Sequence, residues 1–177
     1  VQTGAGGYIT LKPEDAMAIE QYCDAVAAVS PSISTRAQVV YANKNWNTQI
    51  QGTGEKFPQV RKWNVAEGTY FDETHVAAAA KVCVLGSLVK QNLFEDEDPI
   101  GKTIRINKIP FKVIGVLESK GEQGGFFNRD DMIAAPYTTV MRRLRGVDYI
   151  SSIDVEAISS DMTDEAQRQI EELMRER

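Results

Sequence analysis

The sequence predicts an α+β protein made of two mixed α/β subdomains, and three observations support this fold class. Apolar and polar side chains alternate over residues 103–117 on either side of a turn, which is typical of two half-buried strands. Residues 1–54 have the pattern of a helix followed by two strands, and residues 146–177 that of a strand followed by a helix. The composition is globular, with 42% hydrophobic and 25% charged residues.

The N-terminal elements are predicted to be a helix and two strands. Pro13 is favoured at a first helical position, and the two acidic residues after it suit the positive end of the helix dipole, so a helix is predicted to begin there. Because proline interrupts a helix, we expect this one to end before Pro31. Apolar residues at alternating positions then predict strands over residues 32–40 and 45–52.

The middle of the chain is predicted to form a strand, a helix and a hairpin. Residues 82–85 are a continuous apolar run, and the apolar residues after it recur at helical spacing. Asn107 stands at the turn of the hairpin, and asparagine tolerates the left-handed backbone that a two-residue turn requires. Ahead of this unit, residues 60–71 mix aromatic and charged side chains and are interpreted as a short helix and a turn.

A glycine-rich, mobile loop is predicted over residues 119–131, and it carries the adjacent aromatic residues Phe126 and Phe127. Two exposed aromatic side chains on a loop form an apolar anchor, so this pair is the candidate site of partner contact. The alternative, that both rings fold back onto the core of their own subdomain, stays open. Residues 132–135 are predicted to form a short strand, and residues 136–139 to open a helix.

The C-terminal elements are predicted to be a strand over residues 153–157 and a helix that begins at Thr163, whose hydroxyl would cap it. The two ends of the chain therefore resemble each other more than they resemble the middle. We predict that residues 1–54 and 146–177 form one discontinuous subdomain and that residues 55–145 are inserted as a second.

Charge and hydropathy exclude two classes of function. The net charge is -5, whereas a nucleic-acid-binding module carries a basic face. The basic cluster of Arg142, Arg143 and Arg145 is interpreted as the solvated side of a short helix. The apolar stretches are far shorter than the roughly 18 residues of a membrane helix, so this fragment is not expected to be membrane-inserted.

Gly101-Lys102-Thr103 has the ending of a phosphate-binding P-loop but lacks the rest of that motif. The motif requires a glycine five residues before Gly101, where this chain has Asp96 inside an acidic run that would repel a nucleotide. The same run resembles a calcium-binding loop only faintly, because an apolar and an amide residue stand where oxygen ligands belong. We interpret the segment as a surface turn.

The sequence contains no recognisable catalytic set. His75 is the only histidine, whereas an ordinary zinc site needs several nitrogen or sulfur ligands. The adjacent carboxylates Asp72-Glu73 and Asp130-Asp131 are interpreted as solvated charges rather than as acid/base pairs. We therefore expect no enzyme activity, no metal and no cofactor.

The two cysteines are interpreted as small buried apolar residues. Cys23 is expected on the apolar face of the first helix, and Cys83 lies inside the apolar run of residues 82–85. A disulfide between them is the less favoured alternative, because nothing in the sequence brings the two thiols together.

The order and spacing of several segments resemble a known family, the extracytoplasmic core domain of MacB-like ABC transporter permeases. The resemblance covers nearly the whole chain, and Thr69 stands where the family usually has a basic residue. The segments that carry it are Val82-Cys83-Val84-Leu85-Gly86, Leu93-Phe94, Asp98-Pro99-Ile100-Gly101-Lys102, residues 111–117 (Phe-Lys-Val-Ile-Gly-Val-Leu) and Ala135-Pro136-Tyr137-Thr138-Thr139.

The resemblance implies a non-catalytic domain on the periplasmic side of the bacterial inner membrane, held between two transmembrane helices. In this family a Porter subdomain contains both chain ends and a Sabre subdomain is inserted, so residues 1–54 and 146–177 would be Porter-like and residues 55–145 Sabre-like. ATP would be hydrolysed by a separate nucleotide-binding domain of the parent or of a partner chain. The domain would couple that hydrolysis to export, or efflux, by mechanotransmission.

The resemblance also implies partners. The domain would contact a periplasmic adaptor protein, which leads to an outer-membrane exit duct. Phe126 and Phe127, chosen above for their residue type, are the candidate contact to that adaptor or to the substrate. The parent protein is expected to be a homodimer and the isolated fragment a monomer. The exported substrate is not implied, because members of the family are associated with different substrates.

Two other classes of function are weighed against this one. A secreted ligand-binding module without a transport role would have a similar composition, and a parent gene with a signal peptide but no flanking hydrophobic helices would favour it. An enzyme would require a pocket that gathers His75 with carboxylates or a serine, which the sequence gives no reason to expect.

Overall fold

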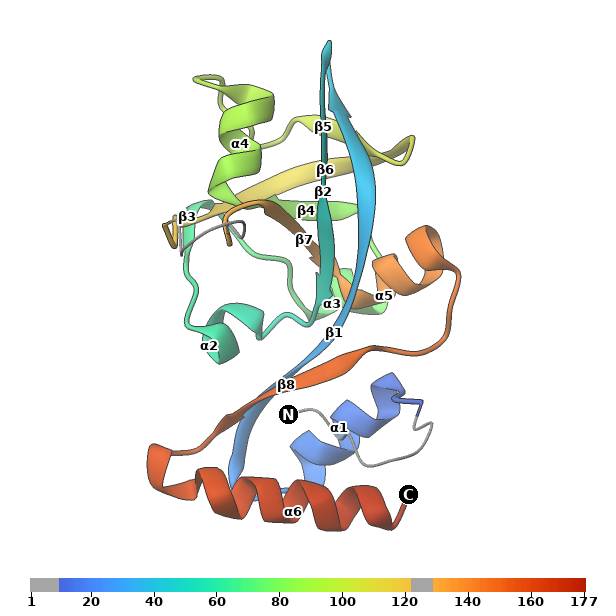
Figure 1. Ribbon diagram of the computed structural model, residues 1–177, viewed down its shortest axis with the longest axis vertical. Helices are drawn as coiled ribbons and strands as arrows, with labels where there is room; N and C mark the ends of the chain where they lie inside the picture. The colour runs from blue at the N-terminus through green and yellow to red at the C-terminus, as the bar shows by residue number, and fades with distance from the viewer. Residues whose placement is uncertain (1–9, 122–128) are drawn as a thin grey trace.

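The structure, a computed structural model, describes residues 10–121 and 129–177. Eight strands and the helices between them make up this part of the chain (Figure 1). In chain order the elements are α1 (Pro13–Tyr22), β1 (Val26–Tyr41), β2 (Lys44–Thr53), α2 (Phe57–Arg61), β3 (Val65–Gly68), α3 (Glu73–Ala77), β4 (Val82–Leu85), α4 (Ser87–Phe94), β5 (Thr103–Ile106), β6 (Ile109–Leu117), β7 (Met132–Pro136), α5 (Tyr137–Thr139), a π-helix (Val140–Arg145), β8 (Ser152–Ala157), a 3-10 helix (Ser160–Met162) and α6 (Thr163–Arg175).

Six of the strands pair in a closed ring, called the strand ring below. β2 pairs with β7, β7 with β4, β4 with β6, β6 with β5, β5 with β1, and β1 again with β2. The closing contact between β1 and β5 is short, and Val39 opposite Ile106 is one of its pairs. The Asn107 N–H extends it by donating to the Gln38 carbonyl at 3.0 Å. β3 pairs with β6, and β8 with the first part of β1.

The main apolar core fills the inside of the strand ring and continues to α1 and α6, where Ile19 and Ile170 belong to it. Each of the six strands contributes a fully buried side chain to it, namely Val39, Ile50, Leu85, Ile104, Phe111 and Ile133. Side chains of a strand alternate between its two faces. Accordingly Cys83 and Leu85 of β4 belong to this core, whereas Val84 belongs to a second cluster with Phe57 and Trp63 on the outer face.

The predicted strand, helix and hairpin are confirmed as β4, α4, β5 and β6. β4 and β6 run parallel, with α4 between them in the chain, and β5 and β6 are antiparallel. Asn107 and Lys108 form the turn, with φ angles of 49° and 71°. Both residues therefore have the left-handed backbone that a two-residue hairpin turn requires.

The first helix is shorter than predicted, and β1 is longer. α1 ends at Tyr22, and Pro31, which was expected to lie beyond a helix, lies inside β1. From Val26 to Pro31 β1 pairs with β8, and its pairing with β2 begins only at Ser32. One edge of β1 is therefore without a strand neighbour at Pro31, and proline is tolerated at such an edge.

Other predicted boundaries differ in detail. The segment expected to be a helix and a turn forms α2 and then a short strand, β3. The helix expected after β7 continues as the π-helix. The capping role predicted for the Thr163 hydroxyl is wrong, because that hydroxyl donates to the Ser160 carbonyl at 3.1 Å, inside the preceding 3-10 turn.

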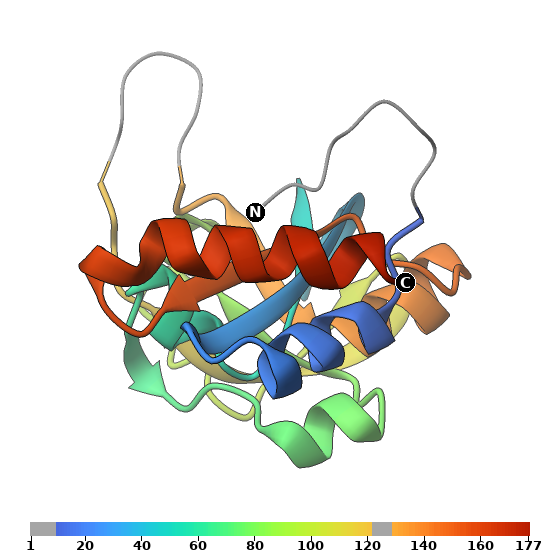
Figure 2. The same cartoon turned by 90° about the horizontal axis from the view of Figure 1, so that it is seen from below.

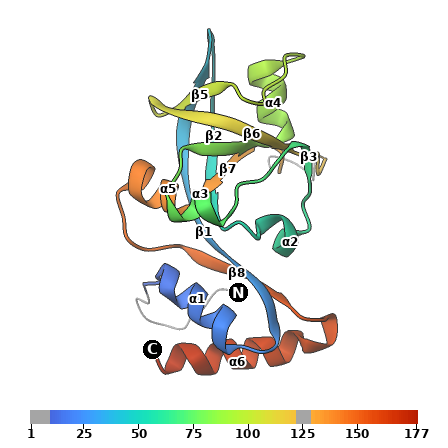
Figure 3. The same ribbon diagram turned by 180° about the vertical axis from the view of Figure 1, so that it is seen from behind.

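Elements from the two ends of the described chain lie together at one end of the molecule (Figures 1 and 3). We call α1, β1 up to Pro31, β8 and α6 the terminal lobe. α1 and α6 lie side by side (Figure 2), and the Arg177 guanidinium forms an ion pair with Asp15 at 2.9 Å. The predicted division at residues 54/55 and 145/146 stays a prediction; β2, assigned with the ends, is a member of the strand ring.

Candidate functional site

The predicted contact residues Phe126 and Phe127 lie outside the described residues. The two segments that flank them, residues 119–121 and 129–131, are described and lie together. We call these two segments the loop base. Beside it lies a pocket, and the terminal lobe lies farther along the molecule. These three regions are the parts of the molecule with candidate functional roles.

Asp130 holds the loop base together. Its carboxylate is buried and accepts hydrogen bonds from the Ser119 hydroxyl at 2.8 Å, from the Lys120 N–H at 2.8 Å and from the Gly121 N–H at 3.3 Å. Its carbonyl accepts the Leu88 N–H at 3.2 Å, so the loop base is also fixed to α4. The expectation that Asp130 is a solvated charge is therefore wrong.

The Asp131 carboxylate also accepts hydrogen bonds. One carboxylate oxygen accepts hydrogen bonds from the Trp46 indole N–H at 2.8 Å and from the Thr48 hydroxyl at 2.7 Å, both on β2. Neighbouring carboxylates that each accept several hydrogen bonds anchor a segment of chain. Asp130 and Asp131 thus attach the loop base to opposite sides of β7, and both differ from the predicted solvated charges.

The pocket beside the loop base has a volume of about 240 Å³. Side chains of β2, β7, α2 and the loop base line it: Gln49, Gln51, Phe57, Arg61, Trp63, Lys120, Arg129, Asp131 and Met132. The Lys120 ammonium lies 5.8 Å from the centre of the Trp63 ring and donates to the Lys62 carbonyl at 2.9 Å. The pocket therefore combines a basic rim with an aromatic wall.

His75 and its neighbours form a helix cap. The Asp72 carboxylate accepts the His75 N–H at 3.1 Å, and the Asp72 N–H donates to His75 Nδ1 at 3.2 Å, which is the reciprocal pattern of a capping box. This cap fixes the first turn of α3. Within the described ranges no three histidine, cysteine, aspartate or glutamate side chains are placed to hold a metal ion.

The two cysteines are free and buried. Cys23 follows the last residue of α1 as its C-terminal cap, rather than lying on the face of the helix as predicted. Burial raises the pKa of the Cys83 thiol. Burial, and after it the Asp24 carboxylate, raises the pKa of Cys23. Both thiols are therefore protonated apolar residues at neutral pH.

The segment with the ending of a P-loop is a surface turn, as interpreted. Gly101, Lys102 and Thr103 are exposed, and Gly101 has a φ of 84°. The Gly101 N–H donates to the Val113 carbonyl at 2.8 Å, so it is directed at the hairpin rather than at a phosphate.

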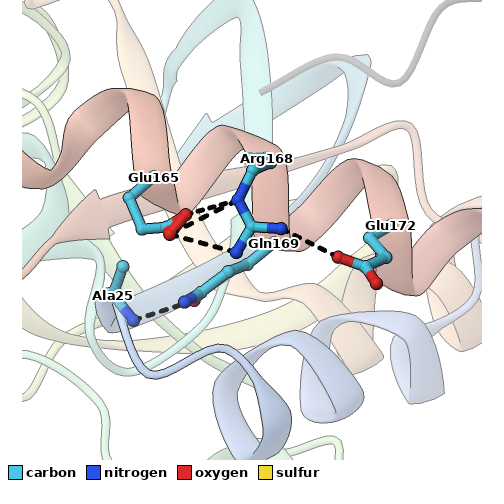
Figure 4. Close-up of polar contacts among 5 residues, drawn as sticks. All are labelled: Ala25, Glu165, Arg168, Gln169 and Glu172. Carbon is cyan, nitrogen blue, oxygen red and sulfur yellow. Dashed lines mark hydrogen bonds and ion pairs between the residues drawn. The ribbon is translucent and has the colours of Figure 1, made fainter.

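Figure 4 shows the polar contacts of α6, one to the start of β1 and the others within the helix. The Gln169 side chain of α6 accepts the Ala25 N–H at 2.9 Å, at the start of β1. On the exposed side of α6 Arg168 contacts both Glu165 and Glu172, and Arg168 lowers the pKa of Glu165. The Gln169 contact holds α6 against the beginning of β1, whereas the Arg168 pairs lie within α6 and stabilise the helix itself.

Three exposed side-chain pairs join the terminal lobe to the region around α2. We call them the junction pairs; they are Lys56–Glu20 at 2.8 Å, Gln59–Glu156 at 2.8 Å and Arg61–Asp154 at 3.2 Å. A second connection is β1, which runs for 16 residues without interruption from the terminal lobe into the strand ring. None of these pairs could have been found from the sequence, because each joins residues at least 36 positions apart.

No helix in the described part of the chain has the length and apolar character needed to cross a membrane.

Comparison with known families gives a match over residues 1–173 to the MacB-like periplasmic core domain. A "Macrolide export ATP-binding/permease protein MacB" from Bdellovibrio bacteriovorus is 38% identical over 177 residues, which cover 100% of this chain and 27% of that protein. A protein of the same name from Syntrophobacter fumaroxidans is 42% identical over 147 residues, covering 82% of this chain and 21% of that protein. The chain thus spans about a quarter of the length of these relatives.

Two solved structures share the fold. The periplasmic region of MacB from Actinobacillus actinomycetemcomitans superposes with a TM-score of 0.83 and 28% identity, over 96% of this chain and 75% of that one. The extracellular domain of the noncanonic ABC-type transporter YknZ from Gram-positive bacteria superposes with a TM-score of 0.79 over 94% of this chain and 83% of that one. At 18% sequence identity, this superposition shows a common fold and nothing more.

Proposed function

This chain belongs to the family of MacB-like periplasmic core domains, and from that premise we propose that it is a non-catalytic, force-transmitting domain of an ABC transporter permease. Family membership places the domain outside the cytoplasm. In the proposed role, ATP is hydrolysed by a nucleotide-binding domain elsewhere in the parent protein or on a partner chain. The domain passes the resulting movement outward and thereby drives export.

The continuity of β1 carries this proposal. β1 begins in the terminal lobe, where both ends of the described chain meet, and ends at the far tip of the molecule (Figure 1). At about 3.3 Å per residue, its 16 residues span about 50 Å. Hydrogen bonds to β8, β2 and β5 stiffen it along its length. A movement imposed on the terminal lobe is therefore transmitted to the strand ring through one unbroken strand.

The partners belong to the same proposal. We propose that the parent is a homodimer on the periplasmic side of the bacterial inner membrane, and that the isolated domain is a monomer. A periplasmic adaptor protein would connect the domain to an outer-membrane exit duct, with Phe126 and Phe127 as the contact. The described loop base supports this assignment, because Asp130 holds the two flanks of that segment at fixed positions.

The junction pairs provide a test in the full-length parent. The triple variant Glu20→Gln, Asp154→Asn and Glu156→Gln removes their carboxylates. Exposed ion pairs contribute about 0–1 kcal/mol each, so the fold is retained. We expect ATP hydrolysis to continue and export per ATP hydrolysed to fall, because the terminal lobe can then move without the region around α2.

A second triple variant, Glu67→Gln, Asp161→Asn and Glu176→Gln, changes the same number of exposed carboxylates away from the junction and serves as control. It is expected to export as the parent does. Equal export by both triple variants, at equal amounts of protein in the membrane, would show that the junction does not transmit force.

A further inference from the structure

The pocket beside the loop base carries an unusual charge for this chain. Three cationic side chains and one carboxylate line it, although the chain as a whole has a net charge of -5. The carboxylate is Asp131, and its Oδ1 already accepts hydrogen bonds from β2. The lining therefore attracts anions, and it does so on a molecule that otherwise repels them.

The three cationic side chains differ in the ion pairs and hydrogen bonds that they form. Arg61 forms an ion pair with Asp154 at 3.2 Å, and Lys120 donates to the Lys62 carbonyl. Arg129 is exposed and has no ion-pair partner within residues 10–121 and 129–177. A guanidinium presents several N–H donors in one plane, which suits a carboxylate or another flat anionic group. Arg129 is the cation best placed to bind one.

The floor of the pocket carries two glutamine side chains whose amides can bind a ligand. Gln49 and Gln51 are half-buried and lie on the same face of β2, two residues apart. Among the described residues their side-chain amides have no hydrogen-bond partner. Neither amide is buried without a partner, so both reach solvent and are available to bind a polar group of a ligand.

The opposite wall is apolar and flat. Phe57 and Met132 are buried, and Trp63 is 8% exposed. The Trp63 indole N–H donates to the Glu118 carbonyl at 2.7 Å, so its polar group is satisfied and its position is fixed. Its ring contacts Phe57 and lies beneath the Lys120 ammonium, so the exposed edge of the indole is the apolar surface against which the body of a small ligand can pack.

We propose that this pocket binds a small organic carboxylate with a flat apolar body. The carboxylate contacts Arg129 at the rim, the body packs against Trp63, and Gln49 and Gln51 bind its remaining polar groups. The volume of about 240 Å³ lies below the roughly 300–1,000 Å³ of pockets that hold drug-sized molecules, so the ligand is small. This site does not depend on the transport role proposed above, because the residues of the pocket alone form it.

The proposal is tested by titrating the isotope-labelled 177-residue chain with 2-naphthoate and with its neutral analogue 2-naphthalenemethanol, followed by NMR. We expect 2-naphthoate to shift the Trp63 indole signal and the side-chain amide signals of Gln49 and Gln51. The neutral analogue is expected to bind about tenfold more weakly, because it cannot form the charge-assisted hydrogen bonds. Equal affinity of the two compounds, or shifts confined to other parts of the molecule, would overturn the proposal.

Three variants locate the anion contact. Arg129→Gln is expected to weaken 2-naphthoate binding about fivefold to tenfold, and Arg129→Lys to weaken it less because the charge is kept. Arg175→Gln makes the same change of charge on exposed α6 and is expected to leave binding unchanged. Both positions are exposed, so the three variants are expected to fold, and a thermal unfolding scan checks this. If Arg129→Gln and Arg175→Gln bind 2-naphthoate alike, Arg129 has no part in the site.

Discussion

The strand ring and the terminal lobe are stabilised in different ways. The ring encloses fully buried side chains from all six of its strands and is closed by hydrogen bonds on every side. In α6, by contrast, only Ala166 and Ile170 are buried, and the exposed face depends on pairs such as Arg168 with Glu165. Buried packing is worth far more than exposed ion pairs. The two regions share one apolar cluster, but from this difference we expect the ring to be the more rigid part and the terminal lobe to be the part that opens first.

The largest effect should come from the core of the ring. Phe111→Ala removes a fully buried ring from β6 and leaves a cavity, which is expected to lower the free energy of unfolding by about 3–5 kcal/mol. The matched pair is Ile104→Ala, at a 0% exposed position of β5 in the ring, and Ile170→Ala, at a 1% exposed position of α6, and Ile170→Ala is expected to cost less than either change in the ring. Urea unfolding measures all three. A larger loss for Ile170→Ala than for Ile104→Ala would reverse the assignment of the rigid part.

A smaller effect should appear in the reactivity of the two thiols. Cys23 lines a groove with Leu173 of α6, so opening of the terminal lobe alone exposes it, whereas Cys83 inside β4 reacts only when the ring opens. We expect a thiol reagent to modify Cys23 about 100-fold faster, which corresponds to about 2.7 kcal/mol between the two openings. Because the thiolate is the reacting form, both modification rates are expected to increase as the pH rises.

The variants Cys23→Ser and Cys83→Ser assign the two rates. Each leaves a single thiol, so the remaining modification rate belongs to one region. If the two rates are equal, both regions open in one cooperative step, and the distinction between rigid and moving parts fails.

The smallest effect is expected on the outer face of α6. Arg168→Gln removes the contacts to Glu165 and Glu172, and we expect the melting temperature at pH 7 to fall by less than about 2 °C. Because Arg168 lowers the pKa of Glu165, this contribution is full above the ordinary glutamate pKa and is lost as the pH falls through the lowered value. Scans at pH 7 and pH 3 measure it. A difference that persists at pH 3 would mean that Arg168 acts by packing rather than by charge.

Local patterns in the sequence predicted local structure well. The turn at Asn107 and the strand around Cys83 were found because alternation and turn residues act over a few positions. The junction of α1 and β1 was misjudged because Pro31 was taken as a helix terminator. Its tolerance in a strand depends on β2 starting to pair only at Ser32, a fact of tertiary structure.

The candidate sites could be predicted only in part. Asp130 and Asp131 were noticed as neighbours, but their hydrogen bonds to Ser119 and Trp46 involve other segments, so burial could not be foreseen. The pocket joins residues of β2, α2, β7 and the loop base, and no spacing in the sequence connects them. The closure of the ring escaped prediction for the same reason, because alternation identifies strands but not their partners.

The ring also constrains the order in which the chain can fold. β1 and β2 are synthesised first, yet β2 completes its pairing with β7, which begins at Met132, and β1 with β5, which begins at Thr103. After Thr53, at the end of β2, about 80 residues must therefore be made before β7 begins, and the strand edges exposed until then favour association with other chains. Safe biogenesis of this domain depends on shielding its first hairpin until the partner strands arrive.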